Sequence, residues 1–388
     1  MALLVLFVSL NSQPIVLWND FRYAQIRYPS EYEQMANFLN QKSNEDFRIL
    51  LLPPYPSVKH NWAPYLWISS LDGYLMKNPF FGRCVPERME PLALDFSSSL
   101  IVAFQQNSLY LVNIFRLANV RYVVLMNDCL GSVNYADVLS SQHYIKLEKV
   151  FGDTFIYRVN EEYFLPHIYA TSDVVLVNGS IGDMFKIVTS EDFNVSRSAL
   201  FLSNQLNTSQ LQFIRQYNGT AKNQNFLLTF QKIDSTRYKV YIKASRPFFL
   251  VFSESYSPLW KAYYGDVDWL KAFWANPISD DKHFPVNGYA NAWYVDPKQL
   301  RIKSNEFTIT IYYCPQSLFY MGWIVTSLTF IGCVSYLAWT NESEKTGIRM
   351  LAKRIRILHR DVNYRNPKIL PPSLNSRLLP LQELRVRI

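Results

Sequence analysis

The sequence lacks the short motifs by which many soluble enzymes are recognised. Its five histidines are widely scattered, and no H-E-x-x-H, G-x-S-x-G or phosphate-cradling glycine loop occurs in a chain with only 12 glycines. The four cysteines form no C-x-x-C pair, so a structural zinc site is not expected. Protease, hydrolase and NTPase activities therefore lack a site, and we expect no catalytic residue, metal or cofactor in this chain.

An excess of charge of one sign is also missing from most of the chain. The formal net charge is +8, but residues 340–388 alone hold 11 Lys/Arg against 4 Asp/Glu, which leaves 28 against 27 for residues 1–339. A neutral body does not attract a phosphate backbone, so nucleic acid is not an expected partner.

Cysteine is scarce, and only one pair is a candidate for a disulfide. Cys333 lies in an apolar run, whereas Cys84 and Cys129 lie in the body of the chain. These two either pair in an oxidising compartment or remain free buried thiols, and both alternatives stay open.

One long apolar run stands out. Residues 317–339 contain no charge and no proline over 23 residues, and about 20 suffice to cross a bilayer. Aromatic residues that favour the headgroup region lie towards both ends of the run: Tyr320, Trp323, Tyr336 and Trp339. The pattern predicts a transmembrane helix, and a buried helix of a soluble protein is the alternative.

The charges after this run predict its orientation. Basic residues are concentrated on the cytoplasmic side of membrane helices, and six of them follow the run: Lys345, Arg349, Lys353, Arg354, Arg356 and Arg360. We therefore expect residues 340–388 to be a basic cytoplasmic tail and the preceding body to be extracytoplasmic. Apolar residues at helical spacing (Ile348, Leu351, Ile355, Leu358) lie on the inner leaflet or belong to a solvated flank.

Two further features bear on localisation. Among the N-glycosylation triplets, those at Asn178, Asn194, Asn207 and Asn218 fall in the body, which agrees with an external position in a cell-surface glycoprotein. Residues 1–18 begin with a ten-residue stretch that is apolar except for Ser9 and has no basic flank. We interpret them as a partial transmembrane helix of a multi-pass protein, or as a degenerate signal segment of a single-pass one.

Residues 20–164 show the pattern of a small α/β domain. Ser30 and Glu33 form a capping-box signature before a helix over about 30–42, followed by an apolar strand over 47–52. Residues 108–118 and 120–126 repeat the helix-to-strand order, and 144–147 and 154–159 are expected edge strands.

Residues 165–316 change to short segments of period two. Tyr238, Val240 and Ile242 alternate with basic residues, and residues 307–313 alternate similarly, with turn residues such as Asn287-Gly288 between segments. This predicts an antiparallel β-sandwich whose last strand leads into the membrane helix. The fold class is thus an α+β membrane protein.

An aromatic cluster is the one candidate binding feature. Flat rings with polar edges stack on sugars, but they also fill cores or contact headgroups. Core and interface are the favoured roles, with glycan binding as the hypothesis to test; its candidate residues are Trp260, Lys261, Tyr263, Trp269, Trp274, Asn287 and Trp293. Asp266-Val-Asp268 matches a metal-binding D-x-D, yet a solvated turn is the favoured interpretation.

An ordered set of segments resembles a known group of proteins. These are the segments at 119–124 (NVRYVV), 165–170 (LPHIYA), 252–264 (FSESYSPLWKAYY), 286–289 (VNGY) and 312–316 (YYCPQ) before the apolar run. Over about residues 100–340 the chain resembles the extracytoplasmic C-terminal part of polytopic envelope proteins of the GT-C glycosyltransferase type. These include YfhO-type bacterial proteins and archaeal proteins related to a 6-pyruvoyl-tetrahydropterin synthase membrane domain.

The resemblance implies a function and partners. Members of this group are expected to transfer sugar from a polyprenyl-phosphate donor to an envelope acceptor, with the catalytic acid in a multi-helix membrane domain that this sequence does not contain. It implies an accessory portion that works with the bilayer, a polyprenyl-phosphate-linked sugar or envelope glycan, and an upstream polytopic membrane subunit. The alternative is a self-standing cell-surface glycoprotein with a glycan-binding or structural role.

Overall fold

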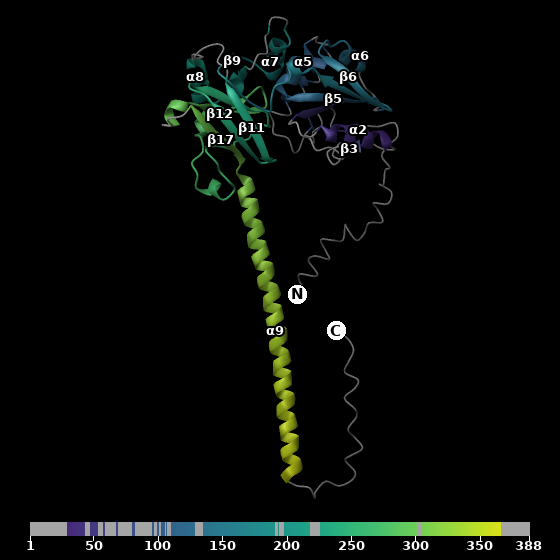
Figure 1. Cartoon of the computed structure of the whole chain (residues 1–388), viewed down its shortest axis with the longest axis vertical. Coiled ribbons are helices and arrows are strands. Elements are labelled where there is room, and N and C mark those ends of the chain that lie inside the picture. Colours follow the sequence, from purple (N-terminus) through teal and green to yellow (C-terminus); the bar gives the residue numbers. More distant parts are fainter. Residues whose placement is uncertain are drawn as a thin grey trace. The chain divides into compact units, whose positions relative to one another are not determined.

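The structure is a computed structural model that describes residues 29–365 with gaps (Figure 1). The gaps are 43–46, 53–56, 59–66, 69–79, 82–94, 97–98, 101, 105, 107–109, 129–134, 191–192, 194–197, 218–225 and 301–304. Two compact units, Met1–Gln316 and Ser317–Ile388, make up the chain. Residues 1–18, Cys84, Cys129, Asn194 and Asn218 lie outside the described residues.

The first half of the body is built on a five-stranded mixed sheet of order β4-β1-β5-β7-β6. Strands β4 (Phe80–Phe81), β1 (Arg48–Leu52) and β5 (Val120–Met126) are parallel, whereas β7 (Thr154–Val159) and β6 (Ile145–Phe151) continue the sheet antiparallel. The strands at 47–52 and 120–126 are confirmed, and so is β6 as an edge strand. The expectation that β7 is an edge strand is wrong, because β5 and β6 pair with its two sides. A short hairpin of β2 (Ser57–Val58) and β3 (Trp67–Ile68) lies apart from this sheet.

Helices cover both faces of this sheet, which explains why β1 and β5 are buried throughout. Alternate residues of a strand point to opposite faces. Ile49 and Leu51 pack in a cluster with α2 (Ser30–Gln41), whereas Leu50 and Leu52 pack with α5 (Leu111–Leu117). Figure 1 shows α2 and α5 on opposite sides of β5. A further short helix, α6 (Tyr135–Ser140), contacts β6.

The predicted first helix is confirmed, but its capping box is not formed. The predicted buried positions Tyr32, Met35, Ala36 and Leu39 are all buried. Pro29 is the N-cap residue and no side chain caps the helix; Ser30 is already its first helical residue. The Ser30 hydroxyl instead donates to Glu31 at 3.4 Å.

Residues 172–217 contain an αβ segment that the sequence pattern did not predict. Strands β9 (Val174–Val177) and β10 (Ala199–Leu202) pair in parallel, and α7 (Ile181–Val188) connects them. The helix α8 (Thr208–Gln216) follows β10. Short apolar runs fit a strand of a sandwich as well as one of a parallel pair, so periodicity alone did not separate the two.

The remaining strands form two four-stranded antiparallel sheets, as the alternation of residues 237–243 and 307–313 predicted. One has the order β11-β12-β17-β14 and the other β15-β16-β13-β8. Their bounds are β8 Ile168–Thr171, β11 Leu227–Asp234, β12 Arg237–Lys243, β13 Phe248–Phe252, β14 Trp260–Tyr264, β15 His283–Val286, β16 Ala290–Val295 and β17 Glu306–Tyr313. One hydrophobic cluster takes residues from both sheets, among them Val240, Leu250 and Ile309.

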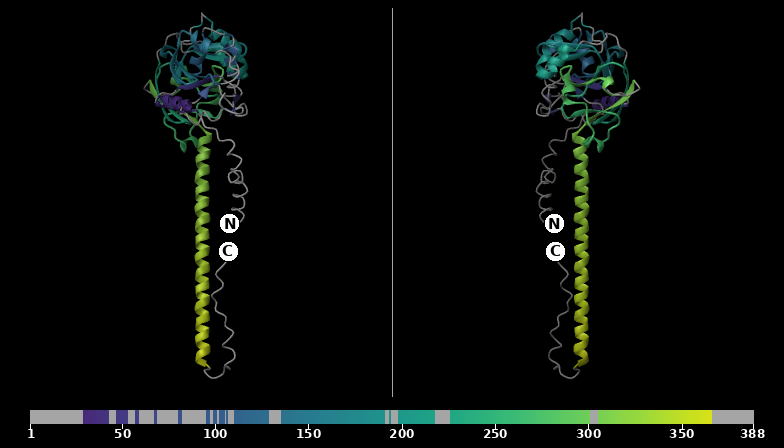
Figure 2. Two further views of the ribbon diagram at one scale, coloured as in Figure 1. Left: turned by 90° about the vertical axis from the view of Figure 1, so that its right-hand side faces the viewer. Right: turned by 90° about the vertical axis from the view of Figure 1, so that its left-hand side faces the viewer.

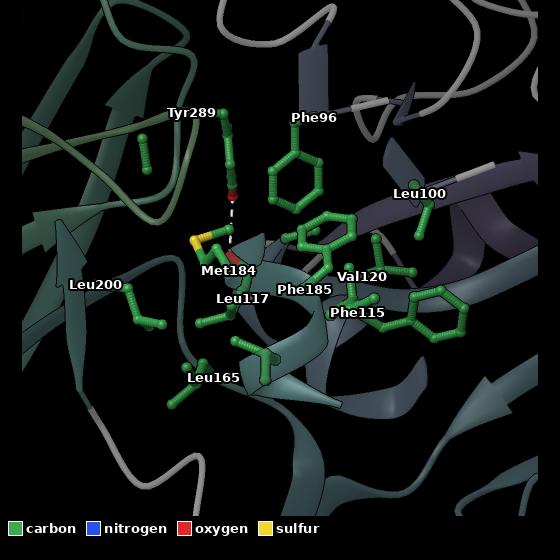
Figure 3. Packing of buried hydrophobic residues seen from close by; sticks show 14 of the residues in the cluster. Phe96, Leu100, Phe115, Leu117, Val120, Leu165, Met184, Phe185, Leu200 and Tyr289 are labelled. Atoms are coloured by element: carbon green, nitrogen blue, oxygen red, sulfur yellow. Dashed lines mark hydrogen bonds between the residues drawn. The ribbon is translucent and has the colours of Figure 1, made fainter. Parts of the chain in front are cut away.

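The core continues from the second sheet into the α/β part of the body. Phe249 and Ala292 belong to the same cluster as Phe115 of α5 and Phe185 of α7. Figure 3 shows Tyr289 beside Phe96, where its hydroxyl donates to the Leu117 carbonyl at 3.1 Å. The predicted boundary between residues 164 and 165 therefore does not coincide with a break in the core.

The second unit begins with one continuous helix. Helix α9 runs from Pro315 to Arg365 over 51 residues and is unbroken in both views of Figure 2. Its segment Pro315–Ile357 is long and apolar enough to cross a membrane, and only 6% of its most apolar window is buried. The helix does not end at Trp339, so the basic residues up to Arg365 continue it.

Candidate functional site

The aromatic cluster of the sequence lies around β14, the edge strand next to β17. Trp260 pairs with Tyr313, and Tyr264 pairs with Ile309. The Cys314 amide donates to the Leu259 carbonyl at 3.1 Å. Because α9 starts at Pro315, the start of β14 lies at the end of the sheet where the chain enters the apolar helix.

Four of the seven candidate glycan-binding residues are core residues. Trp293 and Asn287 have no exposed surface, Tyr263 is 2% exposed and Trp260 is 9% exposed. Trp293 stacks on His283 at 4.5 Å between ring centroids, and Trp260 packs edge-on against Phe252 at 4.9 Å. These rings present no face on which a sugar could stack in this conformation.

Asn287 has a structural task in the turn that joins β15 to β16. Its φ is 54° and that of Gly288 is 80°, which only glycine and a few polar residues adopt readily. Its side-chain amide donates to the Tyr169 hydroxyl at 2.9 Å, and its oxygen accepts from the Leu200 amide at 3.1 Å. A Cβ on Gly288 would lie 3.1 Å from Met184, so the turn fits closely against α7.

The other three candidates are at least partly accessible. The Lys261 ammonium pairs with Asp280 at 2.5 Å, and Trp269 is half-buried against Tyr263 and Tyr312. Trp274 is 64% exposed. The structure thus brings all the predicted residues into one region of the body except Asn287, but it leaves Trp274 as the one ring among them that is largely free to touch a partner.

Residues 265–278, which we call the aromatic loop, have two distinct faces. Trp269, Ala272 and Ala275 recur every three residues and pack towards Tyr263, Tyr312 and Cys314, in agreement with the 3-10 turn at Lys271–Phe273. On the other face three apolar side chains are exposed: Leu270 by 44%, Phe273 by 46% and Trp274 by 64%. The Tyr263 hydroxyl lies 3.3 Å from Cys314 Sγ.

The carboxylates of the D-x-D segment have local partners. Asp266 accepts a hydrogen bond from the Lys239 ammonium at 2.9 Å, and this bond is the main reason that the pKa of Asp266 is lowered. Asp268 accepts from the amides of Leu270 and Lys271 and so caps the 3-10 turn. No group of three or more potential metal ligands occurs among the residues that the structure describes.

A buried ionic group joins the two halves of the body, and the sequence analysis did not predict it. Arg48 of β1 is 4% exposed and donates to Glu254 at 2.7 Å, while His167 Nε2 lies 3.2 Å from the other Glu254 oxygen. Burial alone would raise the pKa of Glu254, but the charge of Arg48 and the contact with His167 lower it to about 2. The signal in the sequence was one arginine at the head of an otherwise apolar strand.

A second buried polar pair joins the neighbouring strands β15 and β16. His283 Nε2 lies 3.0 Å from the Asn291 oxygen, and Asn291 donates to the Glu254 carbonyl at 2.8 Å. Burial lowers the pKa of His283 to about 4, against the smaller opposing effect of its contact with Asn291. A neutral, enclosed imidazole of this kind holds strands together and has no exposed edge for a substrate.

Comparison with known proteins yields one likeness. No protein-family model and no curated protein matches the chain. Solved structures of the arabinofuranosyltransferase AftD from mycobacteria are similar to it. One is 10% identical with a TM-score of 0.40 and covers 74% of this chain and 31% of its own. A mutant form is 11% identical with a TM-score of 0.40 and covers 80% of this chain and 34% of its own.

The chain thus spans about a third of the length of AftD. A likeness at this TM-score assigns no function to this chain. The narrower resemblance to YfhO-type and archaeal membrane proteins stays a prediction.

Proposed function

We propose that this chain is a membrane-tethered, extracytoplasmic accessory portion of a GT-C-like glycosyltransferase of the cell envelope, without a catalytic centre of its own. The single observation that carries the tether is the junction at Cys314. The last strand of the body ends at Tyr313, and the apolar helix α9 begins at Pro315. The class of enzyme comes from the resemblance of the ordered segments between residues 119 and 316.

The accessory role rests on what the described residues do with their polar groups. Arg48 and His167 both contact Glu254, and His283 is enclosed with Asn291. Among the described residues of the proposed β-sandwich, which the two four-stranded sheets form, these two histidines are therefore closed to substrate, at 1% and 2% exposed. The work of the sandwich is to position a glycan or a lipid-linked acceptor close to the membrane.

Sidedness is tested by protease treatment of intact cells that produce the chain with an epitope tag after Ile388. The positive charges after the apolar run predict that protease added to intact cells digests the body but not the tag. The tag should be removed only after the membrane is permeabilised. Membranes washed at alkaline pH should retain the chain. Release of the chain by that wash, or removal of the tag from intact cells, contradicts the proposal.

The enzyme partnership has its own test, because a self-standing surface glycoprotein would pass the previous one. The chain purified in mild detergent should co-purify with a polytopic membrane subunit that is encoded immediately upstream. Alternatively, the chain and that subunit should be found in one continuous polypeptide. Recovery as a complete single-pass protein without such a subunit favours the alternative.

Glycan binding is tested at Trp274, because burial makes the other rings unsuitable. Trp274→Ala should change the free energy of unfolding by less than about 0.5 kcal/mol, as most surface substitutions do. It should also weaken the binding of envelope oligosaccharides to the detergent-solubilised chain. Trp260→Ala is the contrasting variant, since removing a buried Trp costs about 3–5 kcal/mol. Unchanged affinity in Trp274→Ala removes the glycan hypothesis.

A further inference from the structure

The exposed face of the aromatic loop has three features that point to one kind of partner. Leu270, Phe273 and Trp274 form an apolar tip on a short, ordered turn. Contiguous exposed apolar groups of this kind mark interaction surfaces. The turn holds them outward because its opposite face is occupied by Trp269, Ala272 and Ala275 in the cluster with Tyr312.

The charge of the tip fits a surface of phosphate headgroups. From Trp269 to Ser279 the only charged residue is Lys271, which is exposed beside the apolar side chains. The nearest carboxylate, that of Asp268, is engaged with the amides of Leu270 and Lys271. Exposed aromatic rings next to a lysine are typical of protein segments that lie in the membrane interface, where the ring is half-solvated and the ammonium meets phosphate.

The position of the tip in the chain fits the same partner. The loop and Cys314 pack against the same cluster, which contains Tyr312, and only Pro315 and Gln316 separate Cys314 from Ser317, the first residue of the uncharged run. Three residues span at most about 10 Å. Leu259, 45% exposed, lies at this end of the sheet as well, because its carbonyl accepts from the Cys314 amide.

We propose that the tip of the aromatic loop, Leu270, Phe273 and Trp274 with Lys271, enters the headgroup region of the bilayer and forms a second membrane contact beside α9. This inference rests on the proposed membrane tether and goes beyond it. A single membrane helix ties the body to the bilayer at one point of the chain only. A second contact restricts which side of the two-sheet body lies against the membrane.

The test uses the full chain in lipid nanodiscs, with p-benzoylphenylalanine in place of single aromatic residues and irradiation to form adducts. Phe273 is the test position and Phe330 of α9 is the positive control. Tyr241, exposed by 42% against 46% for Phe273, is the matched negative control. Tyr241 pairs with Thr308, five residues before Tyr313, or about 16 Å along a strand.

Lipid adducts at positions 273 and 330, with none at 241, are the expected result. If lipid adducts form at position 330 but at neither 273 nor 241, the second contact is overturned and the tether stays intact. Absence of adducts at 330 as well refutes the tether and the second contact together. An adduct of position 273 with added envelope oligosaccharide in place of lipid would assign the tip to glycan binding and also overturn the inference.

Discussion

At the scale of the residue, Arg48 is the buried charge on which the contact between the two halves of the body depends. Arg48→Met should lower the free energy of unfolding by about 3 kcal/mol, the lower end for a buried pair, because the carboxylate of Glu254, whose side chain is 24% exposed, would lose its cation. Thermal unfolding in detergent measures this. Lys243→Met is the matched control, since its pair with Glu306 is exposed and a surface pair contributes little to stability. Equal losses in the two variants would contradict the assignment.

His283 should make the body sensitive to moderate acid. Its pKa is about 4 in the folded chain, whereas a free histidine has a pKa of about 6.5. Between these values the unfolded chain binds a proton that the folded chain does not, so stability falls as the pH falls through this window.

The loss attributable to His283 is about 3 kcal/mol at roughly 1.4 kcal/mol per pKa unit. Unfolding temperatures measured from pH 7 to pH 4 should therefore decline less steeply in His283→Gln than in the wild-type chain. The lowered pKa of Glu254 also makes stability fall as the pH falls, but this effect begins only near pH 4.5, the ordinary pKa of the carboxyl group. Parallel curves for both proteins would rule out the enclosed neutral imidazole.

At the scale of the element, α7 shows how local sequence fixes a helix start. The Ser180 hydroxyl accepts from the Asp183 amide at 3.3 Å, and the Asp183 carboxylate accepts from the Ser180 amide at 3.0 Å. This reciprocal pair is a capping box. Gly179, with a φ of 138°, precedes it where a Cβ would lie 2.6 Å from Asp183.

Ser180→Ala should cost about 1 kcal/mol, because an amide at the start of the helix loses its acceptor. Chemical denaturation of the full chain in detergent measures the change. Lys186→Ala on the same helix, which removes only an exposed contact with Asp183, should change stability by less than about 0.5 kcal/mol. A cost for Ser180→Ala no larger than that of the control would show that the cap does not contribute.

At the scale of the whole molecule, the proposed insertion into a membrane would depend on the apolar part of α9. Leu328 is at the centre of the uncharged run and is 64% exposed. Leu328→Arg should make insertion less favourable by about 3 kcal/mol, since a charge at the centre of a membrane helix is costly. Ile355→Arg, in the basic half of the same helix, should have little effect.

The measurement is the fraction of chain that inserts into microsomes, read from modification of a reporter site in the body. A fall in that fraction for Leu328→Arg alone is expected. Equal behaviour of the two variants would contradict the placement of the membrane segment within residues 317–339.

Some elements follow from the order of residues alone, because the spacing of apolar residues along the chain is sufficient to predict them. The strands at 48–52 and 120–126, the helix from Ser30 and the alternation of residues 238–242 follow from periodicity, because burial of one face or both requires apolar residues at fixed spacing. The length and apolarity of the span that includes residues 317–339 follow in the same way.

Only the tertiary structure decided which side chains meet across large sequence separations. Arg48 and Glu254 are 206 residues apart, and no spacing rule relates them. Trp293 and Trp274 read alike as aromatic residues of one segment, yet one stacks on His283 in the interior and the other is exposed. Whether a side chain is buried depends on which other parts of the chain pack against it. The packing of the sheets buries most of the candidate residues, and it leaves the exposed side chains of the aromatic loop as the candidate site.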